Sequence, residues 1–161
     1  MRSLQERLVD VPQVGRVTWI GLRPEHGEPV HAVAAVTAIV GHGLEGDVAA
    51  RGRGGGKRQV SLVQAEHLPV IAALTGVAQV TPAMLRRNLV IAGVNLLALV
   101  RLRFAIGDQV VLAGTGPCAP CALMDESVAA GAFQAMRGHG GITASVERGG
   151  WIRVGDRVRV V

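Results

Sequence analysis

Both cysteines of the chain lie three residues apart, as Cys118 and Cys121 in the stretch TGPCAPCALMDE. This spacing serves three chemistries: zinc binding, thiol–disulfide exchange, and binding of a soft metal by one thiolate with the second cysteine in support. The two sulfurs could instead pack as small hydrophobic groups. The flanking Gly116, Pro117 and Pro120 argue against such packing, because they indicate an exposed turn.

Zinc is disfavoured because a structural site needs four ligands and the chain has no second Cys-x-x-Cys. The histidines are scattered, and His139 in RGHGG is the best placed for a site, whereas we expect His31 to be a core residue. A redox Cys-x-x-Cys belongs early in a thioredoxin-like fold, and here it lies late, after a predicted hairpin. Thiol–disulfide exchange through Cys118 and Cys121 nevertheless stays open.

The glycine-rich stretch ARGRGGGKR, residues 50–58, is not a Walker A phosphate loop. That motif would need Gly at position 51 and Ser or Thr at position 58, where the chain has Arg51 and Arg58. It also leads into a predicted strand, so no helix N-terminus follows it. The glycines beside Lys57 could still wrap an anion with backbone N–H groups, or the stretch could be a solvated hairpin loop.

The composition is that of one globular domain with an aliphatic core. Of 161 residues, 49 % are hydrophobic and 18 % are charged, and 2 % are aromatic. The net charge of +5 comes from 17 basic and 12 acidic residues. Nucleic acid is disfavoured because stacking aromatics are nearly absent. A small anionic ligand such as a phosphate accounts for the charge, and so does a plain basic surface.

The chain is expected to be cytoplasmic, with no membrane partner. Its longest uncharged apolar runs, 30–40 and 88–100, are shorter than the roughly 18–20 residues that span a bilayer. The N-terminus contains acids and no apolar segment of the kind found in secretory signals. Two cysteines without a signal indicate a reducing compartment and no structural disulfide.

Many short strands with few helices predict a mainly β protein, a barrel or a sandwich. We expect strands at 14–22, 58–63 and 88–93, one or two buried strands in 30–40, a loop at 41–47, and Gly-Asp hairpins at 101–114 and 151–161. Helices are expected at 64–74 before Gly76, at a short segment starting with Thr81-Pro82, and at 124–136.

The order of these motifs resembles the MOSC family, named for the C-terminal domain of molybdenum cofactor sulfurases. The segments that carry the resemblance are GLEGD, GGKRQVSLVQAEHL, LRRNLVIAGVNL, FAIGDQVVL, TGPCAPCALMDE, MRGHGGITASV and IRVGDRVRV, which span about residues 35–161. The chain is similar to the short, stand-alone bacterial members. The resemblance implies a single β-barrel-like domain, residues 1–161, with a few short helices that binds the molybdenum cofactor (molybdopterin).

The resemblance also implies the site residues. Cys121 matches the functional cysteine of the family, which is the molybdenum ligand in related reductases, and Cys118 matches a cysteine that only some members have. Basic, amide and glycine residues match the segments expected to hold the phosphate or nucleotide of the cofactor: Lys57, Arg58, Gln59, Arg86, Arg87, Asn88, His139, Gly140 and Gly141.

The implied activity is reduction of small N-hydroxylated compounds, such as amidoximes, with electrons from a redox partner. A carrier of sulfur or of the cofactor, using a Cys121 persulfide, is the alternative. One departure from the family concerns GLEGD, which many members continue with a basic residue and a histidine, and which Val48-Ala49-Ala50 follow here. Any role of that histidine is absent or supplied elsewhere, for example by His42.

Overall fold

The computed structural model describes residues 1–161 and is mainly β, as predicted. The strands are β1 (Gly15–Leu22), β2 (His31–Val33), β3 (Ala35–Ile39), β4 (Gly43–Leu44), β5 (Val60–Gln64), β6 (Leu89–Ala92), β7 (Arg103–Ile106), β8 (Val110–Pro117), β9 (Ile142–Arg148), β10 (Gly150–Arg153) and β11 (Arg157–Val160). The helices are α1 (Leu4–Val9), α2 (His67–Thr75), α3 (Pro82–Leu85), α4 (Met124–Ser127) and α5 (Ala132–Met136), with 3-10 turns η1 (Val48–Arg51) and η2 (Leu96–Leu99).

The large sheet closes into a barrel in the order β11-β7-β8-β9-β5-β6-β1. Closure comes from the β1–β11 pair, in which Gly15 lies opposite Val158. Neighbouring strands are antiparallel except β5 and β6, which run parallel and are joined through α2 and α3. Strand β2 extends the sheet beyond β1, and β10, β3 and β4 form a second, three-stranded sheet.

The barrel interior is aliphatic, as the composition predicts. Its cluster of 21 buried residues includes Ile20, Leu62, Leu89 and Ile91, with Phe104 as the aromatic member. Strand β1 places Val17 and Ile20 in this core, and a β-bulge between Val17 and Trp19 interrupts the alternation of its buried side chains. Full burial of each such side chain contributes about 1.5–3 kcal/mol.

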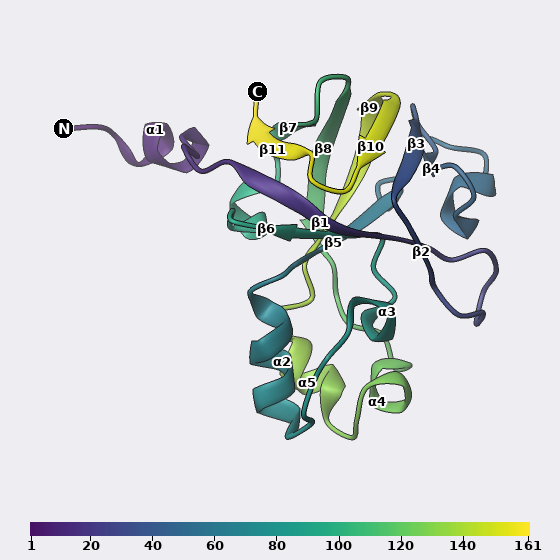
Figure 1. Ribbon diagram of the computed structural model, residues 1–161. Helices are drawn as coiled ribbons and strands as arrows, with labels where there is room; N and C mark the ends of the chain where they lie inside the picture. The colour runs from purple at the N-terminus through teal and green to yellow at the C-terminus, as the bar shows by residue number, and fades with distance from the viewer.

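Four helices, α2 to α5, cover one end of the barrel, below the strands in the view of Figure 1. They share a second cluster of nine buried residues, among them Ile71, Leu85 and Met136. Helix α2 ends at Gly76, whose φ of 77° is the left-handed conformation typical of a C-cap. Helix α3 starts at Pro82 after Thr81, so both predicted helix boundaries are confirmed.

Two predicted elements are wrong. The single helix at 124–136 is two short helices, α4 and α5, because Gly131 adopts a φ of 84° between them. The second hairpin does not form, since β10 pairs with β3 whereas β11 pairs with β7 and β1. The chain turns at Asp156, whose carboxylate accepts a hydrogen bond from the backbone N–H of Arg153, and the two strands then separate into different sheets.

The region 30–40 also differs from expectation. It does hold two strands, but β2 is exposed, so His31 is an exposed residue and not a core residue. Only β3 contributes to the core, through Val36 and Ala38. Within the predicted loop at 41–47, Gly43 and Leu44 pair with β3 as the short strand β4.

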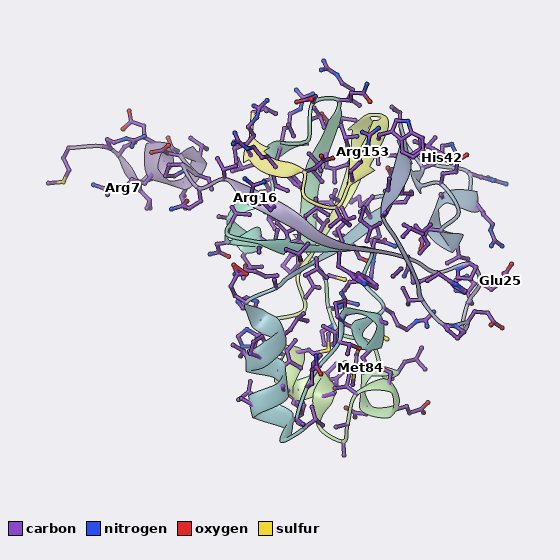
Figure 2. The ribbon with its side chains drawn as sticks, in the orientation of Figure 1. Arg7, Arg16, Glu25, His42, Met84 and Arg153 are labelled. Atoms are coloured by element: carbon purple, nitrogen blue, oxygen red, sulfur yellow. The ribbon has the colours of Figure 1, made fainter.

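The N-terminal helix α1 points away from the barrel (Figure 1). Its first turn has a reciprocal capping box between Ser3 and Glu6, yet none of its residues is buried. Figure 2 shows its side chains, Arg7 among them, extending beside the barrel and not into it. None of the helices is long and apolar enough to cross a bilayer.

Candidate functional site

A cavity of about 290 Å³ lies where the helix-covered end of the barrel meets the Cys-x-x-Cys loop. Four arginines line it, together with Cys121, and we call it the arginine cavity: Arg23, Arg58, Arg86 and Arg87. A smaller cavity of about 70 Å³ shares three of these arginines and reaches Cys118. Neither lining includes a carboxylate, so the arrangement favours an anion.

A larger hollow, of about 860 Å³, lies between the N-terminal segment and residues 93–102. It contains neither cysteine and none of the predicted site residues. Its charged side chains are of both signs, with Arg7 and Arg101 beside Asp10 and Glu66. Chemistry, not size, therefore identifies the arginine cavity as the candidate site.

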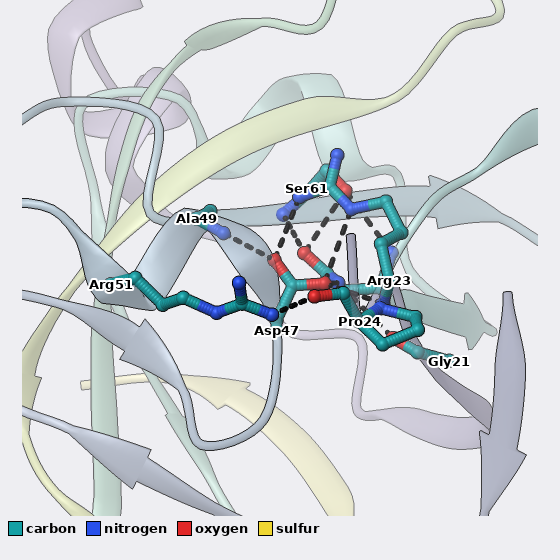
Figure 3. A network of polar contacts seen from close by, with 8 residues as sticks. Gly21, Arg23, Pro24, Asp47, Ala49, Arg51 and Ser61 are labelled. Carbon is teal, nitrogen blue, oxygen red and sulfur yellow. Dashed lines mark hydrogen bonds and ion pairs between the residues drawn. The ribbon is translucent and has the colours of Figure 1, made fainter. Parts of the chain in front are cut away.

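One side of the arginine cavity is fixed by an ion pair between Arg23 and Asp47 (Figure 3). Arg23, which directly follows β1, donates from Nε to Oδ1 at 3.1 Å and from Nη2 to Oδ2 at 2.8 Å. Asp47 also caps η1 by accepting from the backbone N–H of Ala49 at 3.1 Å. Burial opposes the charge of Asp47, but the hydrogen bonds from Arg23 outweigh it and hold the pKa of this carboxyl below its usual value.

Asn88 lines neither cavity but supports this side of the arginine cavity through its contacts with Asp47 and Ser61. Its Oδ1 accepts from the backbone N–H of Ser61 at 3.1 Å and from the Ser61 hydroxyl at 3.2 Å, while its Nδ2 donates to Gly21 O at 3.1 Å and to Asp47 Oδ1 at 3.0 Å. Every polar atom of the amide is thus bonded within the protein. We refer to Arg23, Asp47, Ser61 and Asn88 as the barrel wall.

Arg87 is the cation buried most deeply at the site, with 6 % of the residue exposed. Its Nε donates to Gly140 O at 2.9 Å and its Nη1 to Leu85 O at 3.0 Å, while its Nη2 is buried without a partner. Burial lowers the pKa of Arg87, and the sulfurs of Cys118 and Cys121 oppose that shift. An unpaired buried donor costs about 1–3 kcal/mol, so Nη2 is suited to an anionic oxygen.

The two cysteines are free thiols with opposite exposure. Cys118 is buried, and its backbone N–H donates to Gly141 O at 2.8 Å. Cys121 is exposed and lines the arginine cavity, and its backbone carbonyl accepts a hydrogen bond from the backbone N–H of Met124 at 3.0 Å. We refer to residues 117–123, with the loop 137–141 behind them, as the cysteine wall.

The family model of the MOSC domain matches residues 49–159. The chain belongs to the MOSC domain family. This family is linked to molybdenum cofactor binding. No curated protein is similar enough in sequence to match.

Solved structures agree on the fold of this MOSC chain. YuaD from Bacillus subtilis shares 21 % identity with a TM-score of 0.83, over 94 % of this chain and 98 % of that one. YiiM from Geobacillus stearothermophilus shares 17 % with a TM-score of 0.72, over 91 % and 75 %. YiiM from Escherichia coli shares 21 % with a TM-score of 0.68, over 91 % and 69 %. The MOSC barrel is therefore common to these proteins.

The sequence segments expected to hold the cofactor do not all face the arginine cavity of the MOSC barrel. Arg58 and Arg86 line it, and Arg86 is held by a hydrogen bond from Nη1 to Glu28 O at 2.7 Å. Lys57 lines neither cavity, although its carbonyl accepts from the Thr115 hydroxyl at 2.5 Å. Gln59 is buried and bonded to backbone groups of Gly56 and Val146, so it shapes the loop.

The glycines of the His-Gly-Gly loop contribute space rather than side chains. A Cβ at Gly140 would lie 2.5 Å from Cys118 O, and a Cβ at Gly141 would lie 1.7 Å from Leu62 O. Gly141 also has a φ of 87°, which favours glycine. The two glycines therefore let this loop pass close to both β5 and the cysteine wall.

His139 lies outside the arginine cavity, against the first turn of α2. Its ring packs edge-to-face on His67 with centroids 5.0 Å apart, and its Nδ1 is buried without a partner. Burial and then the charge of His139 lower the pKa of His67, against an opposing effect of Glu66. His42 lies beside Gly54 of the glycine-rich loop and lines neither cavity.

Sequence reasoning missed Arg23 and His26, both of which line the arginine cavity. The available signal was their position in RPEHG, directly after the predicted strand at 14–22, because a strand end at a barrel rim places polar side chains at its mouth. Val48 also lines the cavity, so the segment after Gly-Asp contributes an apolar surface there.

Proposed function

We propose that this MOSC chain binds the molybdenum cofactor, with a phosphate in the arginine cavity and Cys121 as the protein ligand of the metal, and that it reduces N-hydroxylated compounds. The observation that carries the proposal is Arg87, whose buried Nη2 has no partner, in the lining of a cavity with four arginines and no carboxylate. A dianionic phosphate supplies the acceptor that this donor lacks.

The residues present fit such a group. Guanidinium groups suit phosphate oxygens, and Arg23 is oriented by Asp47 through Nε and Nη2, which leaves its Nη1 for such an oxygen. Thiolate sulfur is a ligand that soft and high-valent metals accept, and the exposed thiol of Cys121 lines the same cavity. Asn88 and Gln59 act here as positioning residues, since their amides are bonded within the protein.

When bound, the cofactor supplies the two-electron chemistry, and a redox partner renews the electrons. Reduction of N–OH to N–H and water also consumes two protons. His26 lines the cavity, and its imidazole has one ring nitrogen that donates and one that accepts, so we assign it the delivery of one proton. We place the protein in the cytoplasm, where free thiols such as Cys118 and Cys121 stay reduced.

The alternative is a carrier of sulfur or of the cofactor. The exposure of Cys121 favours it, because a persulfide must be reached by the acceptor protein. A carrier and a reductase share cofactor binding at Arg87 but differ in turnover. Reduction of an amidoxime with reduced viologen as electron donor separates them, since a carrier yields no amidine.

The test of cofactor binding is metal analysis of protein made in cells that synthesise the cofactor. We expect molybdenum in the wild type, at least tenfold less in Arg87→Met, less in Cys121→Ala, and wild-type content in Arg159→Met, whose arginine lies on β11 away from the cavity. Equal molybdenum in wild type and Arg87→Met would contradict the role of Arg87. Equal molybdenum in Cys121→Ala would remove Cys121 as ligand.

A further inference from the structure

We propose that Cys121 and Cys118 are a peroxide-reactive pair, in which Cys121 is oxidised first and Cys118 then closes an intramolecular disulfide. The disulfide withdraws the Cys121 sulfur from the arginine cavity, and reduction by a small thiol returns it. This modification goes beyond the proposed function and needs the two thiols of this chain and one peroxide as the oxidant.

The exposure of the two thiols indicates which of them is oxidised first. Cys121 is exposed, as are its neighbours Ala122 and Leu123, so a dissolved oxidant reaches its sulfur directly. Cys118 is only 5 % exposed, and this burial shields its sulfur from the same oxidant. An accessible thiol beside a protected one is the arrangement of a reacting and a resolving cysteine.

Both sulfurs lie in the same positive surroundings. The cavities that Cys118 and Cys121 line share Arg23, Arg58 and Arg87. Each oxidation step expels hydroxide, and neighbouring cations stabilise the negative charge that develops. No carboxylate in either lining opposes this effect.

The main chain permits the disulfide to close by movement of Cys121 alone. The backbone N–H of Cys118 is anchored to Gly141 O, whereas Ala119 is exposed and precedes Pro120 and Cys121 in the turn before α4. Two intervening residues allow the roughly 4.4–6.8 Å between Cα atoms that a disulfide needs. In the proposed closure Cys121 therefore moves toward Cys118, while Cys118 stays anchored to Gly141 within the cysteine wall.

The chemistry balances with hydrogen peroxide as the oxidant. The Cys121 thiolate attacks one peroxide oxygen, an S–O bond forms, the O–O bond breaks, and hydroxide leaves to give the sulfenic acid. The Cys118 thiolate then attacks the Cys121 sulfur, an S–S bond forms, the S–O bond breaks, and a second hydroxide leaves. The protons of the two thiols convert both hydroxides to water, so one peroxide yields one disulfide.

The test is peroxide titration of the purified full chain, followed by intact mass and a count of free thiols. We expect the wild type to lose both thiols and two hydrogen atoms, to remain a single chain, and to recover both thiols with dithiothreitol. Cys118→Ser should instead give a dimedone adduct on Cys121. Cys121→Ser should leave Cys118 reduced, with a rate at least tenfold below that of the wild type.

Three results would overturn the proposal: a wild type that accumulates dimedone-reactive or further oxidised Cys121, a wild type linked between chains, or a Cys121→Ser variant that reacts as fast as the wild type. The titration is made on protein from cells that do not synthesise the cofactor, so that no metal competes with peroxide for Cys121. Failure of the proposed function would appear as absent metal with disulfide formation intact, and failure of this inference as the reverse.

Discussion

The barrel wall and the cysteine wall lie on two sides of the arginine cavity but are held in opposite ways. In the barrel wall, every polar atom of the Asp47 and Asn88 side chains is hydrogen-bonded to a neighbour within the protein. In the cysteine wall, backbone groups and two glycines hold the chain, and both thiols stay free. A fully bonded wall fixes the position of positive charge, whereas the other wall leaves sulfur able to react.

Gly141→Ala should break the cysteine wall with the largest effect. Its Cβ would lie 1.7 Å from Leu62 O, at a φ of 87°, so β5 or the loop must move. We expect a loss of about 4 kcal/mol or more in the free energy of unfolding, measured with urea. Gly138→Ala is the matched control: its φ is 80° with no atom within 4 Å, and it should cost about 1–2 kcal/mol.

Asp47→Ala should break the barrel wall almost as severely. It leaves Arg23 without its partner and removes an acceptor from Asn88, and loss of one member of a buried pair costs about 3–5 kcal/mol. The exposed pair of Arg51 and Glu25 provides the control, because Glu25→Ala should change stability by less than about 1 kcal/mol. Equal effects of the two variants in urea unfolding would show that the ion pair does not hold this wall.

As the pH falls, the contribution of His67, which packs on His139 behind the cysteine wall, should be lost before that of Asp47 in the barrel wall. Because the pKa of His67 is lowered from 6.5 on folding, its contribution is complete above pH 6.5 and is lost as pH falls through the folded pKa. Asp47, whose pKa is lowered from 3.8, loses its contribution only below pH 3.8. We expect His67→Gln to reduce the fall in unfolding free energy between pH 7.5 and 5; an unchanged slope would contradict this.

The smallest effects should come from the thiols themselves. Cys118→Ser buries a hydroxyl where a sulfur now packs, and we expect it to lower the free energy of unfolding by about 1 kcal/mol. Cys121→Ser lies at an exposed position and should change it by less than about 0.5 kcal/mol. Thermal unfolding of both variants would measure the two losses of stability. A larger loss for Cys121→Ser would mean that the Cys121 side chain stabilises the cysteine wall.

Local sequence signals predicted much of the fold. β-Branched residues before Pro24 identified β1, and alternation identified β5. The turn chemistry of Gly76 identified the end of α2, and Thr81-Pro82 identified the start of α3. The second hairpin failed because pairing of β10 with β3 and of β11 with β1 is decided by contacts far apart in the chain. The helix at 124–136 failed because its alanines outweighed the one conformational signal, Gly131.

The candidate site was predictable in composition and less so in geometry. The residue types alone indicated the chemistry, with arginines for an anion and cysteines for a metal or redox role. The resemblance to the MOSC family assigned them to one site. The sequence could not separate Arg87, which keeps an unpaired donor at the cavity, from the adjacent Asn88, whose amide is fully bonded. Nor could it bring Arg23 and His26 to the same cavity as Cys121, because only the closed barrel places these distant segments together.

The pairing of β1 with β11 has a consequence for how the protein is made. Val17 exchanges hydrogen bonds with the turn that leads into β11, its N–H bonding Asp156 O at 2.9 Å and its O accepting from Gly155 at 2.7 Å. During synthesis one edge of β1 therefore stays unpaired until β11 has been made. A nascent chain of this kind offers chaperones a long interval for capture.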